Sequence, residues 1–100
     1  MTKEKIAGAL GLCRRAGKIT AGTYLVKEEI RCGRAALVLV ASDAGADARE
    51  KLNRLAAHKG IPVRETPLTK SEMAQAIGKS GEAVCASVPK EFLNLVLASL

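Results

Sequence analysis

A continuous apolar run restricts the fold of this chain more than any other feature of its sequence. Residues 37–41 read Leu-Val-Leu-Val-Ala, without a polar side chain, and polar and glycine residues lie on either side. Such a run is typical of a strand buried on both faces, because an exposed face would place polar residues at every second position. It predicts the central strand of a sheet that helices cover on both sides.

Helical and strand-like segments alternate along the chain. Apolar residues at helical spacing, glycines just beyond helix ends and a capping box at Thr69 and Glu72 provide the helix signals. The predicted helices span residues 3–16, 23–32, 47–59, 70–77 and 89–100, and the predicted strands span residues 18–20, 37–41, 61–65 and 83–87. For 100 residues this alternation predicts a single α/β domain, a three-layer α/β/α sandwich with a small mixed four-stranded sheet.

Positive charge is concentrated in the first third of the chain. The formal net charge is +6, and residues 1–34 contain eight basic and three acidic side chains, whereas the other 66 residues contain eight basic and seven acidic ones. A clustered positive field favours a polyanionic partner, because each phosphate that is neutralised releases condensed counterions. Charge alone leaves open a second interpretation, in which these side chains form solvated helix faces that keep the protein soluble.

The cysteines and the single histidine indicate no catalytic or metal site. Cys13, Cys32 and Cys85 form no Cys-x-x-Cys pair, so neither a zinc site nor a disulfide framework is expected. Cys13 and Cys85 have the apolar neighbours of core residues. His58 falls near the end of a predicted helix, where a solvent-facing histidine suits the helix dipole.

Two further motifs resemble ligand sites. Gly78-Lys79-Ser80 looks like the end of a phosphate-binding loop, but Met73 stands where that loop needs a glycine, so Gly78 is expected to end a helix. Asp43 follows the central strand, where open α/β sheets bind ligands, yet no second carboxylate pairs with it and we expect it to bond its own backbone in a turn. We therefore predict no catalytic residue, no metal and no cofactor.

The sequence also indicates a compartment. The early apolar stretch, residues 6–12, is too short to cross a membrane, and Arg14 and Arg15 follow it, whereas a secretory signal would place its charges first. Scattered cysteines suit a reducing cytoplasm. We expect a cytoplasmic monomer that has no membrane partner.

Aromatic residues are too few for one mode of RNA binding. Tyr24 and Phe92 are the only two, whereas single-strand binders of the RRM and OB types stack bases on aromatic platforms. If RNA is the ligand, its shape, phosphates and base edges must carry recognition.

The start of the second predicted helix offers a means of binding anions. Gly22 lets a phosphate approach closely, and the free amides of the turn that begins at Thr23 attract negative charge. A helix cap without a ligand is the alternative interpretation. The charge argument assigns supporting phosphate contacts to Arg14, Lys18 and Arg31, and Lys27, which is also close to this helix start in sequence, is a further candidate RNA-binding residue.

Several segments, taken in order, resemble a known family. They are residues 11–18 (Gly-Leu-Cys-Arg-Arg-Ala-Gly-Lys), Gly22, residues 30–35 (Ile-Arg-Cys-Gly-Arg-Ala), residues 37–44, residues 61–63 and residues 77–79. Their order and spacing resemble the YlxQ family of bacteria, a branch of the kink-turn-binding ribosomal protein superfamily.

This resemblance implies an α/β/α sandwich that docks the start of its second helix into sharply bent RNA. Gly22 and Thr23 would meet the RNA backbone at the kink, and side chains on the second helix would read sheared G·A pairs. The loop of Lys79, Ser80 and Gly81 would lie against the bulged nucleotides. Structured RNA, either ribosomal or kink-turn-like, is the expected partner, with the ribosome as a candidate setting.

The start of the second helix departs from that of archaeal and eukaryotic relatives. They carry Gly-x-Asn-Glu-x-x-Lys or Gly-x-Lys-Gln-x-x-Lys, whereas this chain has Tyr24, Leu25 and Glu28 at the reading positions. Lys27 comes one residue early, about 100° round the helix. Since a lost bidentate base contact typically costs about 1–3 kcal/mol of discrimination, we expect discrimination to suffer before affinity.

The sequence thus predicts a non-enzymatic RNA-binding protein associated with the ribosome or with translation. A rival hypothesis is a protein-interaction module that retains the fold but has lost kink-turn base readout. It rests on Tyr24 and Leu25, two apolar residues at an exposed helix start. A third hypothesis, a small-ligand or nucleotide enzyme acting at Asp43, rests on position alone.

Overall fold

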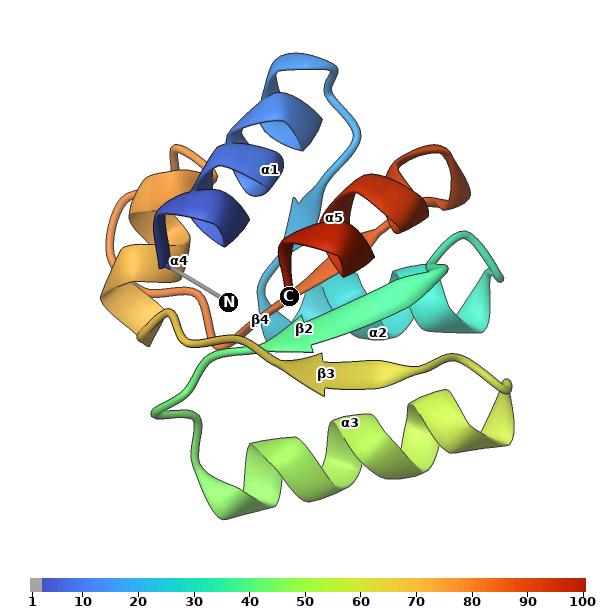
Figure 1. Ribbon diagram of the computed structural model, residues 1–100. Helices are drawn as coiled ribbons and strands as arrows, with labels where there is room; N and C mark the ends of the chain where they lie inside the picture. The colour runs from blue at the N-terminus through green and yellow to red at the C-terminus, as the bar shows by residue number, and fades with distance from the viewer. Residues whose placement is uncertain (1–2) are drawn as a thin grey trace.

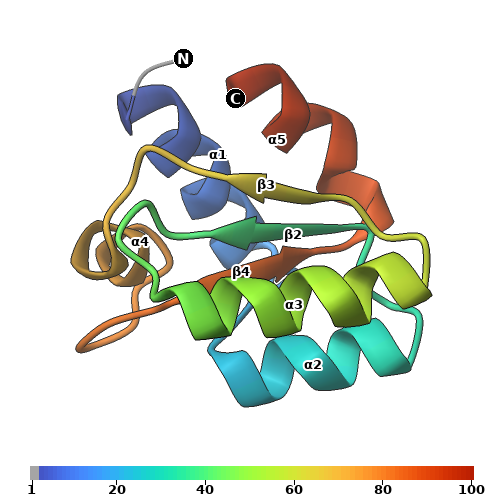
Figure 2. The same ribbon diagram turned by 90° about the horizontal axis from the view of Figure 1, so that it is seen from below.

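A computed structural model describes residues 3–100 as three layers (Figures 1 and 2). In chain order the elements are α1 (Lys3–Arg15), β1 (Thr20–Ala21), α2 (Thr23–Arg31), β2 (Leu37–Val40), α3 (Ala46–His58), β3 (Val63–Glu65), α4 (Lys70–Ala76), β4 (Cys85–Val88), the 3-10 turn η1 (Lys90–Phe92) and α5 (Leu93–Ser99). Helices α1 and α5 cover one face of the sheet, and α2 and α3 cover the other. The short helix α4 packs beside α1 at one end of the sheet. The predicted α/β/α sandwich is confirmed.

The sheet is mixed and four-stranded, as predicted. Its order is β1-β4-β2-β3, with β2 parallel to β3 and β4 antiparallel to both β1 and β2. The apolar run forms β2, an interior strand whose four residues are all buried. In the register, Val38 lies opposite Val63 of β3 and Leu39 lies opposite Ala86 of β4. The run is apolar throughout because helices cover both of its faces.

Helix α1 shows how spacing and a terminator define an element. Its buried residues are Ile6, Ala9, Leu10 and Cys13, which recur at helical intervals along one face. Gly17 follows the helix at φ 68°, and the backbone N–H of Lys18 donates to the Cys13 carbonyl over 2.9 Å. The left-handed glycine therefore ends the helix and satisfies a carbonyl of its last turn.

Helix α4 begins at the predicted capping box, which is confirmed. The Thr69 hydroxyl accepts from the Glu72 amide over 3.2 Å, and the Glu72 carboxylate accepts from the Thr69 amide over 2.9 Å. That amide bond, together with the bond from the Lys3 ammonium, lowers the pKa of Glu72. Asp43 adds a contact that its sequence position did not predict, since its Oδ1 accepts from the Lys70 amide over 2.8 Å.

Two strands begin later than the sequence predicts. Strand β1 is Thr20–Ala21 and not residues 18–20, because the Lys18 amide is already bonded to the end of α1. Strand β3 starts at Val63 and not at residue 61, because the Ile61 amide bonds the Ala56 carbonyl at the end of α3 and Pro62 has no amide to give.

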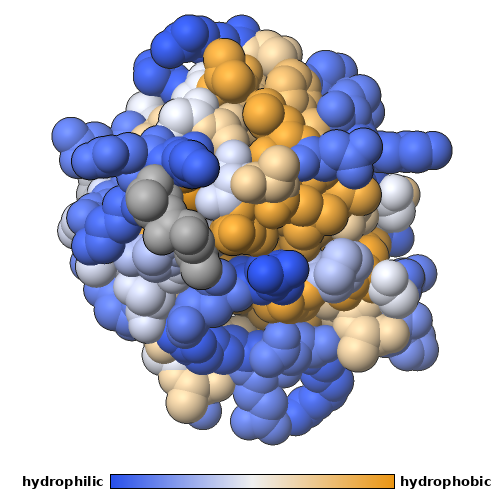
Figure 3. Space-filling model, in the orientation of Figure 1, coloured by the Kyte–Doolittle hydropathy of each residue, from blue (hydrophilic) through white to orange (hydrophobic). Residues whose placement is uncertain are grey.

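The last two elements are also displaced from prediction. Strand β4 covers residues 85–88, in place of 83–87, because its pairing with β2 extends to Val88 opposite Leu37. The expected final helix is divided into η1 and α5, and Pro89 is the residue before η1 in an extended conformation. Figure 3 shows hydrophobic residues gathered over the layer of α5, where Leu95 and Leu97 are partly exposed.

Candidate nucleic-acid interface

The start of α2 has a backbone conformation that only glycine adopts easily. Gly22 lies at φ 96° and ψ 146°, its N–H donates to the Cys85 carbonyl of β4 over 3.0 Å, and its carbonyl accepts from the Val26 amide over 2.9 Å. No side chain caps this helix. The amides of its first turn have no acceptor within the helix, so they are available to an anion.

A lysine from a distant segment lies beside this helix start. The Lys79 ammonium donates to the Ala21 carbonyl over 3.4 Å, and a Cβ placed on Gly22 would lie 3.2 Å from Lys79 Nζ. Residues 21 and 79 are 58 positions apart, so sequence spacing gives no sign of their proximity. The fold therefore adds a positive charge to the positive end of the α2 dipole.

An arginine from α1 completes the cluster. Gly78 has φ 73° and follows α4. Its N–H donates to the Gln75 carbonyl, and the N–H of Lys79 donates to the Ala74 carbonyl, so both bond to the last turn of the helix. The Arg14 guanidinium lies directly against Gly78. Gly78 thus ends α4, as predicted, and its missing side chain leaves room for the arginine. We call Arg14, Gly22, Gly78 and Lys79 the helix-start cluster.

A buried thiol, that of Cys85, belongs to the residue whose carbonyl accepts the Gly22 N–H. Burial raises the pKa of Cys85 to about 11, although a hydrogen bond with the Thr23 side chain and the positive charges of Lys27 and Lys79 act in the opposite direction. Both lysines thus lie near enough to the Cys85 thiol for their charges to act on its pKa. Thr23 therefore connects the first turn of α2 to β4, and Lys27 lies one turn further along the helix.

A shallow hollow of about 310 Å³ opens beside the cluster. It is lined by Ile19, Thr20, Ala21, Leu25, Ile77, Gly78 and Lys79. Apolar groups and one ammonium thus share its wall, which suits a flat, partly polar group such as a nucleobase. Tyr24 is 75% exposed and Leu25 is 50% exposed, so two solvent-facing side chains with apolar surface stand in the first turn of α2.

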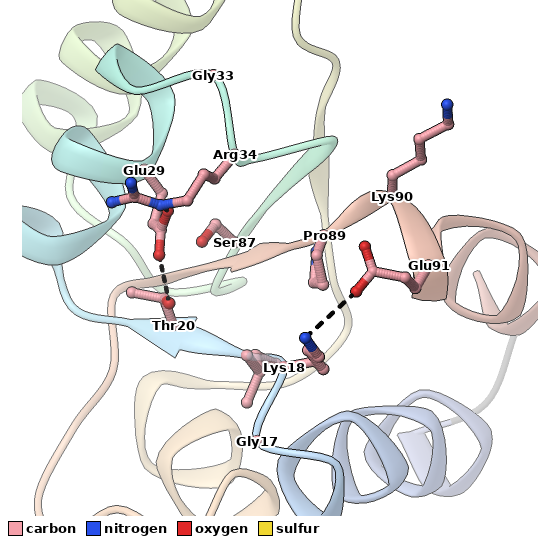
Figure 4. Close-up of a pocket in the computed structure, with 11 residues that line it drawn as sticks. Gly17, Lys18, Thr20, Glu29, Gly33, Arg34, Ser87, Pro89, Lys90 and Glu91 are labelled. Carbon is pink, nitrogen blue, oxygen red and sulfur yellow. Dashed lines mark hydrogen bonds and ion pairs between the residues drawn. The ribbon is translucent and has the colours of Figure 1, made fainter.

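Two predicted contacts lie away from the cluster. Figure 4 shows Lys18 in a pocket of about 460 Å³ beyond the other end of β1, where its ammonium lies 3.6 Å from the Glu91 carboxylate. In the same pocket Thr20 donates to Glu29, which also pairs with Arg34. Arg31 lies in the last turn of α2.

Ion pairing separates the predicted cations into two groups. Lys18 pairs with Glu91, and Arg31 pairs with Glu28 over 3.0 Å. Within residues 3–100, Arg14, Lys27 and Lys79 have no ion pair. Of the cations predicted to contact RNA, those without an acidic partner are thus the ones on or near the helix start. Ser80 and Gly81 continue the exposed loop beyond Lys79.

The residues set aside in the sequence lie as follows. Cys13 and Cys85 are buried in the core, as predicted, and Cys32 is exposed. His58 ends α3 and faces solvent, also as predicted. Among the residues that the structure describes, no three histidine, cysteine or acidic side chains group as metal ligands. In the same part of the chain, no helix has the length and apolar character needed to cross a bilayer.

Comparison with known proteins gives consistent matches over nearly the whole chain. Among curated proteins, "RNA-binding protein YlxQ" of Bacillus subtilis (strain 168) is 32% identical over 91 residues, which make up 91% of this chain and 90% of that protein. "RNA-binding protein YlxQ" of Enterococcus faecium is 32% identical over 77 residues, covering 77% of this chain and 74% of that protein.

Solved structures with the same fold include a protein with unknown function from Bacillus halodurans C, with a TM-score of 0.86, 30% identity and 95% of each chain covered. The Giardia lamblia 15.5kD RNA binding protein matches with a TM-score of 0.77 and 22% identity, over 96% of this chain and 82% of that one, which shows likeness of fold. The family pattern described as ribosomal protein L7Ae/L30e/S12e/Gadd45 matches residues 4–96. With that match and the 32% identity to relatives of similar length, the chain belongs to the ribosomal protein L7Ae/L30e/S12e/Gadd45 family.

Proposed function

We propose that this protein binds structured RNA, without catalysis, through the helix-start cluster and the loop that follows Gly78. One observation carries the proposal: Lys79 lies beside the uncapped start of α2 while Arg14 lies against the adjacent Gly78, and neither cation has an ion pair within residues 3–100. Three separate segments of the chain therefore direct positive charge to one place. That arrangement suits a phosphate, which accepts hydrogen bonds from amides and from cationic side chains together.

The relatives support RNA as the polyanion. Two curated relatives of similar length carry the name RNA-binding protein, and the chain shares 32% identity with each. The shape of the site agrees with such a ligand, because the hollow beside Lys79 can hold an unstacked base while the helix start holds the adjoining phosphate. A kinked or internally looped RNA offers both groups at one point.

Relatives with asparagine, glutamate and lysine at the helix start read sheared G·A pairs with polar side chains. This chain lacks those side chains, so it recognises such pairs differently. Tyr24 and Leu25 provide apolar surface in their place, so they contact bases by stacking and van der Waals packing, not through directed hydrogen bonds. Specificity then depends on the shape of the RNA more than on its base edges. We include ribosomal RNA and kink-turn-like RNA in this class, and with them an association with the ribosome or with translation.

The experiment is a binding titration with a kink-turn RNA hairpin and a fully paired hairpin of equal length, at several salt concentrations. We expect tighter binding of the kinked RNA, and we expect Lys79→Gln to weaken it and to reduce the salt slope by about one unit. Lys90→Gln removes the same charge and is the matched control, because Lys90 lines the pocket of Figure 4 and not the hollow beside the helix-start cluster. Equal affinity for the two hairpins, or equal effects of the two variants, would overturn the proposal.

A second candidate function is docking of a protein partner at Tyr24 and Leu25, which are 75% and 50% exposed. The double variant Tyr24→Ala, Leu25→Ala separates the two. If both side chains contact RNA, the variant lowers affinity for the kinked hairpin while Lys79→Gln lowers it independently. If RNA affinity is unchanged and a purified translation partner is lost, the surface serves protein binding.

A further inference from the structure

A second basic surface lies on the outer side of the layer formed by α2 and α3. We call it the α2/α3 groove; it has a volume of about 400 Å³ and is lined by Lys27, Arg31, Lys51, Arg54, Leu55 and His58. Four of these six side chains are cationic and none is acidic. The charge distribution of the sequence directs attention to the first 34 residues, so the contribution of Lys51 and Arg54 becomes visible only in the fold.

The two helices present matching ridges to this groove. Figure 2 shows α2 and α3 side by side and running in the same direction. Lys27 and Arg31 are four residues apart on α2, and Lys51 and Leu55 are four residues apart on α3, so each pair lies on one helix face. The positive side chains therefore line both walls of the groove along its length.

Helix dipoles explain only part of this arrangement. Arg31 and His58 occupy the last turns of their helices, where positive charge is favoured without any ligand. Lys27 and Lys51 stand in the middle of α2 and α3, where no such benefit exists. Neither has an ion pair within residues 3–100, and like charges facing each other across two helices repel. A polyanion in the groove would remove that repulsion.

Each of the two arginines of the groove pairs with a glutamate of its own helix, and neither pairs with an acidic side chain of the opposite helix. Arg31 pairs with Glu28, and Arg54 pairs with Glu50 over 2.6 Å, each within its own helix. More than half of each arginine side chain is exposed, so these pairs contribute little and leave guanidinium donors free. Exposed guanidinium groups of this kind bind phosphate oxygens well.

Helix α2 links the groove to the helix-start cluster. From Gly22 to Arg31 the helix rises about 14 Å, and helical nucleic acid carries a phosphate every few ångströms along each strand. A strand whose phosphate sits at Gly22 can therefore continue over several phosphates beside Lys27 and Arg31. We infer that the α2/α3 groove holds the phosphate backbone of a helical arm of the same RNA that the helix-start cluster binds, an inference that rests on the proposed function.

The test changes residues of α3 only, so that the groove is altered while the helix-start cluster is retained. The variant Lys51→Gln, Arg54→Gln removes two charges from the far wall. Two probes are compared: a kink-turn RNA with minimal arms and the same RNA with both arms extended beyond the length of α2. The matched control is Arg64→Gln, Lys90→Gln. Arg64 points away from α3, because its neighbour Glu65 pairs with Arg49 of α3 and strand side chains alternate.

We expect the wild-type protein to bind the long-armed RNA with a steeper salt dependence than the short-armed RNA. The groove variant should lose about two units of salt slope and roughly tenfold in affinity at low salt on the long-armed RNA, and little on the short-armed RNA. The control variant should leave unchanged both the difference in salt slope and the difference in affinity between the long-armed and the short-armed RNA. Thermal unfolding of each variant verifies that the fold is retained.

The outcomes separate the two proposals. If the wild-type protein binds neither RNA, the proposed function fails and the groove inference fails with it. If it binds both equally and the groove variant behaves as wild type, only the groove inference is overturned, which is also the result expected if the groove serves an acidic protein segment. Equal losses on short-armed and long-armed RNA would likewise overturn it, because they would show a general charge effect.

Discussion

The Arg14 guanidinium lies so close to Gly78 that a Cβ on this glycine would overlap Arg14 Cζ. The contact joins the last turn of α1 to the end of α4, two elements separated by more than half of the chain. It places the guanidinium of this exposed arginine against the residue that precedes Lys79. The glycine thus controls where a cation of the helix-start cluster lies.

Replacing Gly78 should therefore affect both stability and RNA binding. In Gly78→Ala the left-handed backbone at φ 73° costs about 1–2 kcal/mol, and the arginine must move away. Urea unfolding measures the first effect and titration with the kinked hairpin measures the second. Gly60→Ala, at φ 70° with no atom within 4 Å of the new Cβ, is the control for backbone strain alone, because Gly60 lies outside the helix-start cluster and the loop that follows Gly78.

A double-mutant cycle isolates the role of the arginine. If Gly78→Ala acts on RNA binding by displacing Arg14, it should have no further effect on affinity in an Arg14→Ala background. Additive losses of affinity in the double variant would show that Gly78 acts by another route.

The glycine before α2 should be far less tolerant than the glycine before α3. Gly22→Ala forces alanine into φ 96° and ψ 146°, a region that is essentially restricted to glycine, and should lower the free energy of unfolding by about 1–3 kcal/mol. Gly45 also precedes a helix, but at φ −65° and ψ 153°, with open space around its Cβ position. Gly45→Ala should change stability by less than about 1 kcal/mol, as measured by chemical denaturation. Similar losses at both glycines would contradict this interpretation.

Replacing a glycine in the middle of α1 with alanine should stabilise the protein. Gly8 is exposed, has ordinary helical geometry and leaves open space, with no atom within 4 Å, where a Cβ would lie. Gly8→Ala should stabilise the protein by about 0.5–1 kcal/mol, because alanine loses less backbone entropy in a helix. The check is an increase in the melting temperature of a few degrees, on the order of 2–8 °C. A melting temperature at or below that of wild type would show that α1 depends on this glycine.

The buried thiol of Cys85 should make the protein sensitive to alkali. Burial raises its pKa from the ordinary value of 9.0 to about 11. Above about pH 9 the unfolded chain releases the thiol proton and the folded chain keeps it, so rising pH favours unfolding until the folded pKa is passed. Between about pH 8 and about pH 10 the free energy of unfolding should fall by roughly 1 kcal/mol from this group.

Denaturant titrations across that pH range measure the effect. Cys85→Ala should flatten the alkaline decline, leaving the smaller contribution of Cys13, whose pKa burial also raises. An identical decline in the Cys85→Ala variant would place its origin elsewhere.

Local signals in the sequence predicted most of the fold. The apolar run of β2, the capping box at Thr69 and the glycine after α1 each depend on near neighbours, and a single sequence contains that information. The observed strand ends differ from the predicted ones where a backbone amide could bond either the preceding helix or the sheet. The Lys18 and Ile61 amides bond the ends of the preceding helices, so they are not available to the sheet.

The candidate site was less predictable because its contacts are long-range. Gly22 was identifiable from its place before an apolar helix, but nothing local places Lys79 beside it or Arg14 against Gly78. Conversely, Lys18 is close to Gly22 in sequence and lies in a different pocket, paired with Glu91. Charge summed along the chain could not show which cations lack an acidic partner, since pairing is a property of the folded surface.

The doubly capped start of α4 has a consequence for affinity. A helix of seven residues is marginal by itself, yet the capping box and the Asp43 carboxylate fix its first turn to the loop after β2. The segment that carries Lys79 therefore leaves a helix whose position folding has already set. The helix that ends just before Lys79 therefore loses less conformational entropy when a ligand arrives, and a smaller entropy loss favours binding.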